Sequence, residues 1–261
     1  MPDFTAADPT RRADSSVLTA LRILQSVPFN SVRLPARAGL IFPLVQEGRN
    51  LAPGPDETAH NPGGIRPVAW RADSEVLAFF SDCARYRYAL VEVWNPELPL
   101  IMWLLMNPSM AGLRFSDSTV TKTGKISRHH GAGGQVIVNT GAFRATKQQD
   151  LRGQEAIGPE NFSTIQKLAP AALKVVLAYG KPPAELEAAG PEISRMLREQ
   201  GADLYYLKKR LDGRPMHPLA RGRSAISAQA ELIRWGEAEE HELAAPTLHR
   251  RMRELQAFSV S

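Results

Sequence analysis

Residues 100–106 read LIMWLLM, an apolar run that leads directly into the polar stretch Asn107-Pro108-Ser109. A strand that is apolar on both faces is typical of a sheet covered by helices on both sides. The segment 88–94 (YALVEVW) alternates enough to predict a strand with one solvated face. Further apolar segments predict core strands, and candidate helices separate them: 135–140 (QVIVNT), 173–179 (LKVVLAY) and 204–207 (LYYL). This alternation predicts an α/β fold, a three-layer sandwich with a central, mostly parallel sheet.

The predicted helices lie between and around these strands. One short amphipathic helix precedes Pro28, and the others are predicted over 117–130, 160–168, 184–200, 224–235 and 247–258. Residues 50–67 (NLAPGPDETAHNPGGIRP) are rich in proline and glycine, which disfavour a helix or a central strand. We therefore predict two parts, an N-terminal extension over 1–67 and an α/β domain over 68–261.

The composition excludes several classes of protein. The 261-residue chain is 43% hydrophobic and 23% charged, which excludes a wholly disordered protein. Its one cysteine, Cys83, excludes an internal disulfide and a multi-cysteine zinc or iron–sulfur site. No apolar run reaches the roughly 20 residues that span a bilayer, and the polar N-terminus lacks a signal core, so we expect a cytoplasmic protein with no membrane partner. A net charge of 32 − 27 = +5 weakly favours a polyanionic partner.

Polar residues follow the core strands of the predicted sheet. Asn107 follows the strand over 100–106, and Asn139 lies at the end of the strand over 135–140. Gly180 follows the third core strand, and His217 lies beyond the fourth. Ligands of α/β sheets bind outside the carboxyl ends of the strands. These segments therefore predict one site at one edge of the sheet.

The motifs at these positions resemble those of a known family. RYRYAL, LLMNPSMAG, DSTV, GAGGQVIVNTGAFRAT, IGPEN and HPL occur in this order over roughly residues 80–220. They resemble a family of bacterial and phage proteins known only as a domain of unknown function. Two positions depart from that family's usual pattern: Ser118 replaces the proline of Asp-Pro-Thr, and Met216 stands where a basic residue is common. Neither departure removes a candidate catalytic group.

A more distant likeness concerns the chemistry. The order of a strand with a polar-Pro loop, a strand ending in Asn-Thr, a strand ending in Gly and a final His-Pro loop is similar to that of the uracil-DNA glycosylase superfamily. This resemblance implies that Asn107 positions the attacking water, that Asn139 binds the flipped base and that His217 stabilises the departing base. Some bacterial relatives of that fold excise heavily modified cytosines from phage DNA, which implies an antiviral role.

Cleavage of an N-glycosidic bond needs an extrahelical base, a donor to the departing base and a water behind the sugar. Asn107 can hold that water through its carbonyl oxygen but cannot take its proton; Asp117 is the stronger acceptor, and both stay candidates. The Asn139 amide suits the Watson–Crick edge of a pyrimidine. The other predicted base contacts are Phe143 and Pro108. Contacts with the DNA backbone are predicted for Ser109, Arg144, Arg214, Arg221 and Arg223.

We therefore predict a DNA glycosylase that removes a modified pyrimidine, with hydroxymethylcytosine or its glucosylated form in phage DNA as the preferred substrate. We predict neither a cofactor nor a metal, because the adjacent His129 and His130 point about 100° apart on a helix and no His-Glu-x-x-His spacing occurs. Two alternatives stay open. One is a hydrolase or transferase of free nucleotides that reads the base with Asn139, and the other is a non-catalytic nucleic-acid-binding module.

Overall fold

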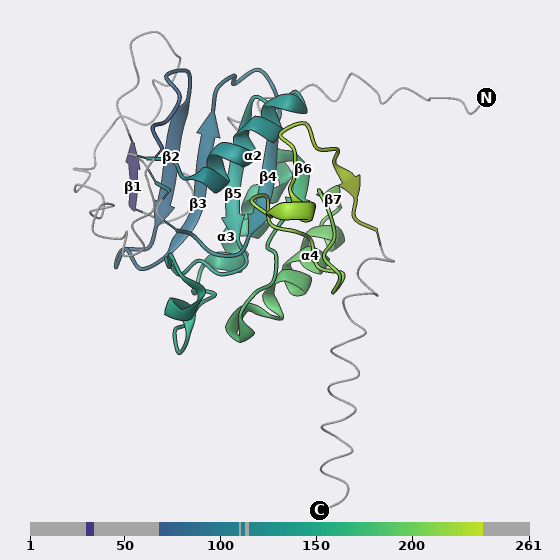
Figure 1. Cartoon of the computed structure of the whole chain (residues 1–261). Helices are drawn as coiled ribbons and strands as arrows, with labels where there is room; N and C mark the ends of the chain where they lie inside the picture. Colours follow the sequence, from purple (N-terminus) through teal and green to yellow (C-terminus); the bar gives the residue numbers. More distant parts are fainter. Residues whose placement is uncertain (1–29, 34–67, 110, 113–114, 237–261) are drawn as a thin grey trace, which may run out of the picture.

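A single sheet organises the part of the chain that the computed structural model describes, residues 30–33, 68–109, 111–112 and 115–236. Its eight strands lie in the order β1-β2-β3-β5-β4-β6-β7-β8 (Figure 1). The strands are β1 (Asn30–Arg33), β2 (Glu75–Phe80), β3 (Arg87–Val93), β4 (Leu100–Leu105), β5 (Gly134–Asn139), β6 (Ala172–Leu177), β7 (Leu204–Tyr206) and β8 (Ile233–Arg234). The α-helices are α2 (Ser118–His129), α3 (Asn161–Leu168) and α4 (Ala189–Glu199).

The sheet is mixed, with parallel strands at its centre. β4 pairs in parallel with β5 and β6, and β6 pairs in parallel with β7. β1, β2 and β3 form an antiparallel meander whose last strand pairs antiparallel with β5, and β8 pairs antiparallel with β7. The prediction of a mostly parallel sheet was therefore right for the four central strands and wrong for both flanks. The connection between β2 and β3 spans only residues 81–86, and such a short connection suits an antiparallel pair.

Helices cover both faces of the sheet, which confirms the three layers. On one face, Val120 and Ile126 of α2 pack into a buried cluster with Trp103 of β4. On the other face, Ile165 of α3 and Ile193 of α4 belong to a second buried cluster. We call these the α2 face and the α3/α4 face. All six residues of β4 are buried, as its apolar sequence predicted.

The boundaries of most predicted elements are confirmed within about two residues, and the structure corrects two helices. The helix predicted over 184–200 is a 3₁₀ turn at Ala184–Leu186 followed by α4. The segment predicted as a helix over 224–235 is extended after a 3₁₀ turn, and ends in β8. Ile226 packs on the α2 face, whereas Trp235 packs against Tyr206 with ring centroids 5.4 Å apart. An extended chain reaches both faces, and this tertiary packing overrides helical periodicity.

The predicted N-terminal extension supplies a strand to the sheet. β1 lies within residues 1–67 and pairs with β2 over Asn30–Arg33. The helices predicted before Pro28 and over 247–258 fall outside the described residues, as does the predicted boundary segment over 50–67. Within the described part of the chain, no helix has both the length and the apolar character needed to cross a membrane.

Candidate functional site

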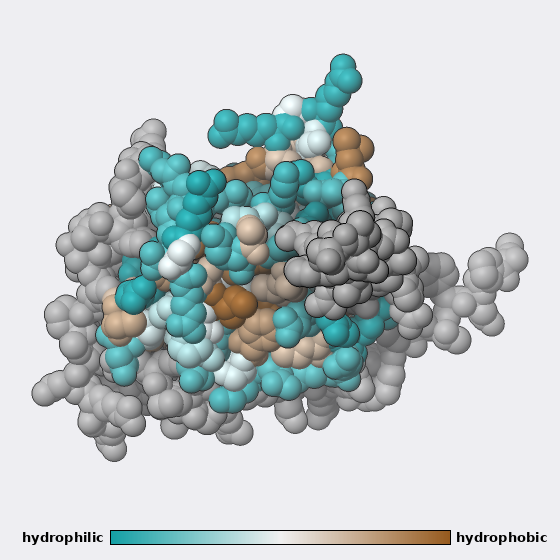
Figure 2. All heavy atoms as spheres, turned by 90° about the horizontal axis from the view of Figure 1, so that it is seen from below, coloured by the Kyte–Doolittle hydropathy of each residue, from teal (hydrophilic) through white to brown (hydrophobic). Residues whose placement is uncertain are grey.

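The candidate site lies at the carboxyl ends of the parallel strands. The connection from β4 to β5 passes through α2 on one face, whereas the connections through α3 and α4 use the other face. The loops that leave β4 and β6 therefore run to opposite faces, and ligands of α/β sheets bind at such a position between neighbouring strands. Figure 2 looks onto this end of the molecule and shows an apolar patch surrounded by hydrophilic residues.

Asn107 joins the loop after β4 to the loop after β5. Its Nδ2 donates a hydrogen bond to the backbone oxygen of Ala145 at 2.6 Å. In return, the Ala145 N–H donates to the backbone oxygen of Pro108 at 2.9 Å. The amide nitrogen of Asn107 is thus committed to the fold. Its Oδ1 accepts no hydrogen bond from the described residues, so this oxygen can receive one from water or a ligand.

Asn139, the last residue of β5, carries the most unusual side chain of the site. Alternation along the strand places it on the α2 face together with Gln135 and Ile137. Asn139 is only 1% exposed, and neither Oδ1 nor Nδ2 has a hydrogen-bond partner among the described residues. A buried polar group without a partner costs about 1–3 kcal/mol. This amide therefore has both a donor and an acceptor ready for a ligand.

Asn161 holds the backbone on either side of this amide, and the sequence analysis did not identify it. Its Nδ2 donates to the backbone oxygens of Asn139 at 2.9 Å and Thr140 at 3.2 Å. Asn161 is the first residue of α3 and is completely buried. It lies in the IGPEN motif, whose Gly158 adopts φ +83° and turns the chain into the helix. The IGPEN motif was the sequence feature that could have pointed to Asn161. Asn161 acts on the site by holding the backbone of Asn139.

Asp117 begins α2 and lies close to the site. Its Oδ1 accepts a hydrogen bond from the Val120 N–H at 2.9 Å, the geometry of a helix N-cap. The carboxylate is 7% exposed, and its charge acts on His217. Its second oxygen, Oδ2, accepts no hydrogen bond from the described residues. Asp117 therefore has one oxygen committed to the helix and one available for chemistry.

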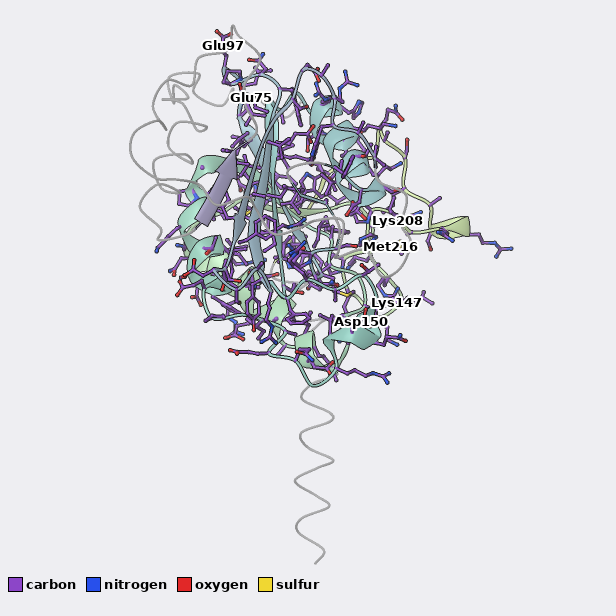
Figure 3. The ribbon with its side chains drawn as sticks, turned by 90° about the vertical axis from the view of Figure 1, so that its left-hand side faces the viewer. Glu75, Glu97, Lys147, Asp150, Lys208 and Met216 are labelled. Carbon is purple, nitrogen blue, oxygen red and sulfur yellow. The ribbon has the colours of Figure 1, made fainter. Side chains whose placement is uncertain are left out.

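His217 reaches the site at the base of a hairpin formed by residues 208–216. The Gly180 N–H donates to Pro215 at 3.0 Å, and the Met216 N–H donates to Lys208 at 2.8 Å. These bonds attach the base of the hairpin to the end of β6. Figure 3 shows Lys208 and Met216, one on each arm, close together at one side of the sheet.

The hydrogen bonding of His217 determines which ring nitrogen can donate. Nδ1 accepts a hydrogen bond from the Leu219 N–H at 3.2 Å, so the neutral ring carries its proton on Nε2. Burial lowers the pKa of His217 below its usual value, and the smaller opposing effect of the Asp117 charge does not reverse this. The ring is therefore neutral at pH 7 and presents Nε2–H as a donor.

Gly180 brings these groups together. Its φ of +70° is in the left-handed region, and a Cβ there would lie 3.3 Å from His217 Cβ and 4.0 Å from Met106 Cε. The end of β4, the end of β6 and His217 are thus in close proximity. The structure brings Gly180 next to His217 and next to Met106, the residue before Asn107, and it brings Asp117 near His217 by charge.

Two of the other predicted site residues take part in internal contacts. Phe143 packs edge-on against Tyr86, with ring centroids 5.8 Å apart, in a cluster at the edge of the site. Arg144 is 6% exposed, and its Nη1 donates to the backbone oxygen of Ala84 at 3.0 Å. Its guanidinium also lies over the Phe80 ring at 5.0 Å. In this arrangement both side chains support the loop after β5.

The predicted backbone contacts differ in their exposure. Arg214 forms ion pairs with Glu187 at 3.2 Å and Asp212 at 3.4 Å, so much of its charge is balanced. Arg221 and Arg223 are exposed. The Ser109 Oγ is buried and has no hydrogen-bond partner among the described residues. Arg214 is thus placed as a support for the hairpin, whereas the other two arginines are free to meet solvent or a ligand.

No group of three or more His, Cys, Asp or Glu side chains is placed to hold a metal ion within the described residues. The site consists instead of two amides, a carboxylate and an imidazole.

Comparison with known proteins gives one match. The model of a family described as "Protein of unknown function (DUF1643)" matches residues 87–219, a span that contains both amides, the carboxylate and the imidazole of the site. No curated protein matches the chain, and no solved structure matches it.

Proposed function

Because this chain belongs to the DUF1643 family, a family of unknown function, we propose its activity from the site itself: a DNA glycosylase that removes a modified pyrimidine and leaves an abasic site. The observation that carries the proposal is the buried Asn139 amide, whose donor and acceptor both lack a partner among the described residues. The order of the motifs, which is similar to that of the uracil-DNA glycosylase superfamily, supports the same reading and a related fold.

Asn139 would recognise the base. The Watson–Crick edge of a cytosine or uracil presents a donor and an acceptor side by side, and a carboxamide can pair with both. A base must leave the stacked duplex to reach such a buried amide, because an intact DNA duplex cannot enter a buried site at the edge of the sheet. The hydrogen bonds from Asn161 to the flanking backbone fix the position of this amide and hence the orientation of the base.

His217 would stabilise the departing base. When the bond between C1′ and the base nitrogen breaks, the base leaves with the electron pair and becomes negative. A neutral imidazole with its proton on Nε2 can donate a hydrogen bond to the base oxygen that acquires this charge. Removing one such donor typically costs about a hundred- to a thousandfold in rate.

Asn107 and Asp117 would position and deprotonate the attacking water. The sugar becomes cationic at C1′, so a positioned water needs little activation to attack it. Oδ1 of Asn107 can orient that water, and the free oxygen of Asp117 can take its proton as the new C1′–O bond forms. The products are the free base and an abasic sugar with a C1′ hydroxyl, and no further reactant is required.

Hydroxymethylcytosine, free or glucosylated, in phage DNA is the substrate class that we propose, with an antiviral role. The resemblance to bacterial proteins that excise such bases supports this preference. The basic segments near the site are suited to a polyanionic substrate.

The test is incubation of the purified protein with duplexes that contain cytosine, uracil, hydroxymethylcytosine or glucosyl-hydroxymethylcytosine. Alkali-labile strand breaks report abasic sites, and mass spectrometry identifies the released base. We expect release of a modified base, strongly reduced in Asn139→Ala and His217→Ala. His129→Ala is the matched control, because His129 is an exposed histidine at the end of α2.

The same variants separate the alternatives. Absence of base release from every duplex and single strand would contradict the glycosylase proposal. Release of a base from free nucleotides alone would indicate a nucleotide hydrolase. Binding of DNA that Asn139→Ala and His217→Ala leave unchanged, without any release, would indicate a non-catalytic module.

A further inference from the structure

The positive charge of the chain is concentrated beside the site. Residues 208–223, which we call the basic segment, contain six lysines and arginines and one acidic residue, a net charge of 6 − 1 = +5. The whole chain also has a net charge of +5, so its remaining charges balance. The basic residues are Lys208, Lys209, Arg210, Arg214, Arg221 and Arg223.

The first part of the basic segment is a well-braced hairpin. Lys209 and Pro215 form a β-bridge, and the Arg210 N–H donates to the backbone oxygen of Arg214 at 2.9 Å. Asp212 accepts a hydrogen bond from the Arg210 side chain at 3.3 Å. Burial alone would raise the pKa of Asp212, but the Arg214 backbone N–H and the neighbouring guanidinium charges lower it below its usual value. The carboxylate is thus a charged brace across the turn.

Leu211 lies at the tip of this braced hairpin. Its relative exposure is 110%, the highest of the large hydrophobic residues that the described ranges expose. Complete burial of a fully solvated leucine by a partner stabilises the complex by about 1.5–3 kcal/mol. Here the turn holds the side chain outward between Arg210 and Asp212, in a hairpin that contains four cationic residues and one acidic residue. A partner that combines an apolar interior with a negatively charged exterior would match both this leucine and the net positive charge of the basic segment.

We propose that the hairpin tip binds duplex DNA, with Leu211 contacting base pairs and the exposed side chains of Lys208, Arg221 and Arg223 contacting phosphates. A duplex has the required chemistry, since stacked bases line its grooves and phosphates border them. Proteins insert leucine and similar side chains between base steps of duplexes. This inference rests on the proposed function and deepens it by naming double-stranded DNA as the substrate.

The exposed hydrophobic residues favour a duplex over a single strand. Proteins that bind single strands stack successive bases on aromatic side chains. The large hydrophobic residues exposed in the described part of the chain are all aliphatic: Leu98, Leu173, Leu211, Leu219 and Ile233. Phe143, the aromatic residue predicted to stack on a base, is instead packed against Tyr86.

The tip and the site can contact the same duplex. Leu211 lies six positions before His217, and an extended chain of that length spans at most about 20 Å. One strand of DNA advances about 3.4 Å per nucleotide, so the tip would lie within about six steps of the flipped base.

The test measures binding of a fluorescent, unmodified 20-base-pair duplex, and of one of its strands alone, by anisotropy over a range of salt concentrations. Leu211→Ala should weaken duplex binding about tenfold, which corresponds to about 1.4 kcal/mol. It should leave single-strand binding and the salt dependence unchanged, because no counterion is released by a leucine. Lys208→Gln should instead lower the slope of log K against log salt by about 0.9. Leu173→Ala is the matched control, an exposed leucine at the start of β6 and hence at the opposite end of that strand from Gly180.

Each outcome decides the question separately from the glycosylase proposal. Selective loss of duplex binding in Leu211→Ala supports the inference, even if no base is released. Wild-type duplex binding by Leu211→Ala, or an equal loss for single strands, overturns it, even if base release is found. Failure of the unaltered protein to bind the duplex overturns it as well. A thermal melt identical to that of the unaltered protein confirms that Leu211→Ala folds normally.

Discussion

Replacing Asn139 with alanine tests directly whether the fold keeps this amide available for a ligand. Asn139 and Asn161 form a matched pair, because they are 1% and 0% exposed and lie at adjoining positions of the fold. The first has two unpaired amide atoms among the described residues, whereas the second donates two hydrogen bonds through Nδ2 and has only Oδ1 unpaired. The same substitution should therefore change the free energy of unfolding differently at the two positions.

The magnitudes follow from the contacts. Asn139→Ala removes two unpaired polar groups, a gain of about 1 kcal/mol each at the lower end of the usual range. Loss of packing at a buried site offsets about 1 kcal/mol of that gain. We therefore expect the free energy of unfolding to stay constant or rise by up to about 1 kcal/mol. Asn161→Ala loses two hydrogen bonds and the same packing, offset by about 1 kcal/mol for its unpaired Oδ1, so we expect a decrease of about 2 kcal/mol.

Urea unfolding, followed by circular dichroism, measures both variants without needing a substrate. A loss of stability in Asn139→Ala as large as that in Asn161→Ala would refute the reasoning, because the Asn139 amide would then be satisfied within the fold. Base release completes the comparison. Asn139→Ala should be stable and inactive, a separation of stability from function that is common at binding sites.

Three further predictions concern the groups around His217. The pKa of His217 is lowered in the folded state, so the unfolded chain binds a proton more readily as the pH falls below about 6.5, and the free energy of unfolding should decrease there. Urea unfolding of His217→Gln should show a smaller decrease with pH. Equal pH profiles for the two proteins would contradict this prediction. Asp117→Asn should keep the helix cap and lose base release, whereas Asp117→Ala should also lose about 1 kcal/mol of stability; full activity in Asp117→Asn would exclude a role for its charge. Gly180→Ala and Gly201→Ala should each lose about 1 kcal/mol because both glycines have positive φ. Only Gly180→Ala should slow base release, since a Cβ at Gly201 meets nothing within 4 Å; equal rates in the two variants would show that Gly180 does not position His217.

The central strands could be predicted because a strand that is buried on both faces is an uninterrupted apolar segment of the sequence. β4 is apolar at every position, and its end is marked by Asn107. The helix that begins after Asp117 could be predicted because its first residues include a capping side chain. The flanks of the sheet were harder. β1 and β8 are short edge strands whose pairing depends on distant partners, Phe80 and Tyr205 among them.

The site was predicted at the level of which residues follow which strands, and less well at the level of what each side chain contacts. Asn107, Asp117 and His217 are at the expected ends of their elements. Asn161 was missed because the IGPEN motif marks its segment but does not show which backbone its side chain binds, 22 residues away in the sequence. Arg214 was predicted at a phosphate because a cluster of arginines shows charge but not the carboxylates that balance it.

The hairpin over 208–216 is fastened at its base by the bonds from Gly180 to Pro215 and from Met216 to Lys208. Because the base of the hairpin is held by these bonds, the position of His217 does not depend on the length or composition of the tip. A lineage could lengthen, shorten or recharge the tip while the imidazole stayed where it is. The hairpin is therefore the place where related chains can change the surface around the site without moving His217, and where a grafted loop should be tolerated.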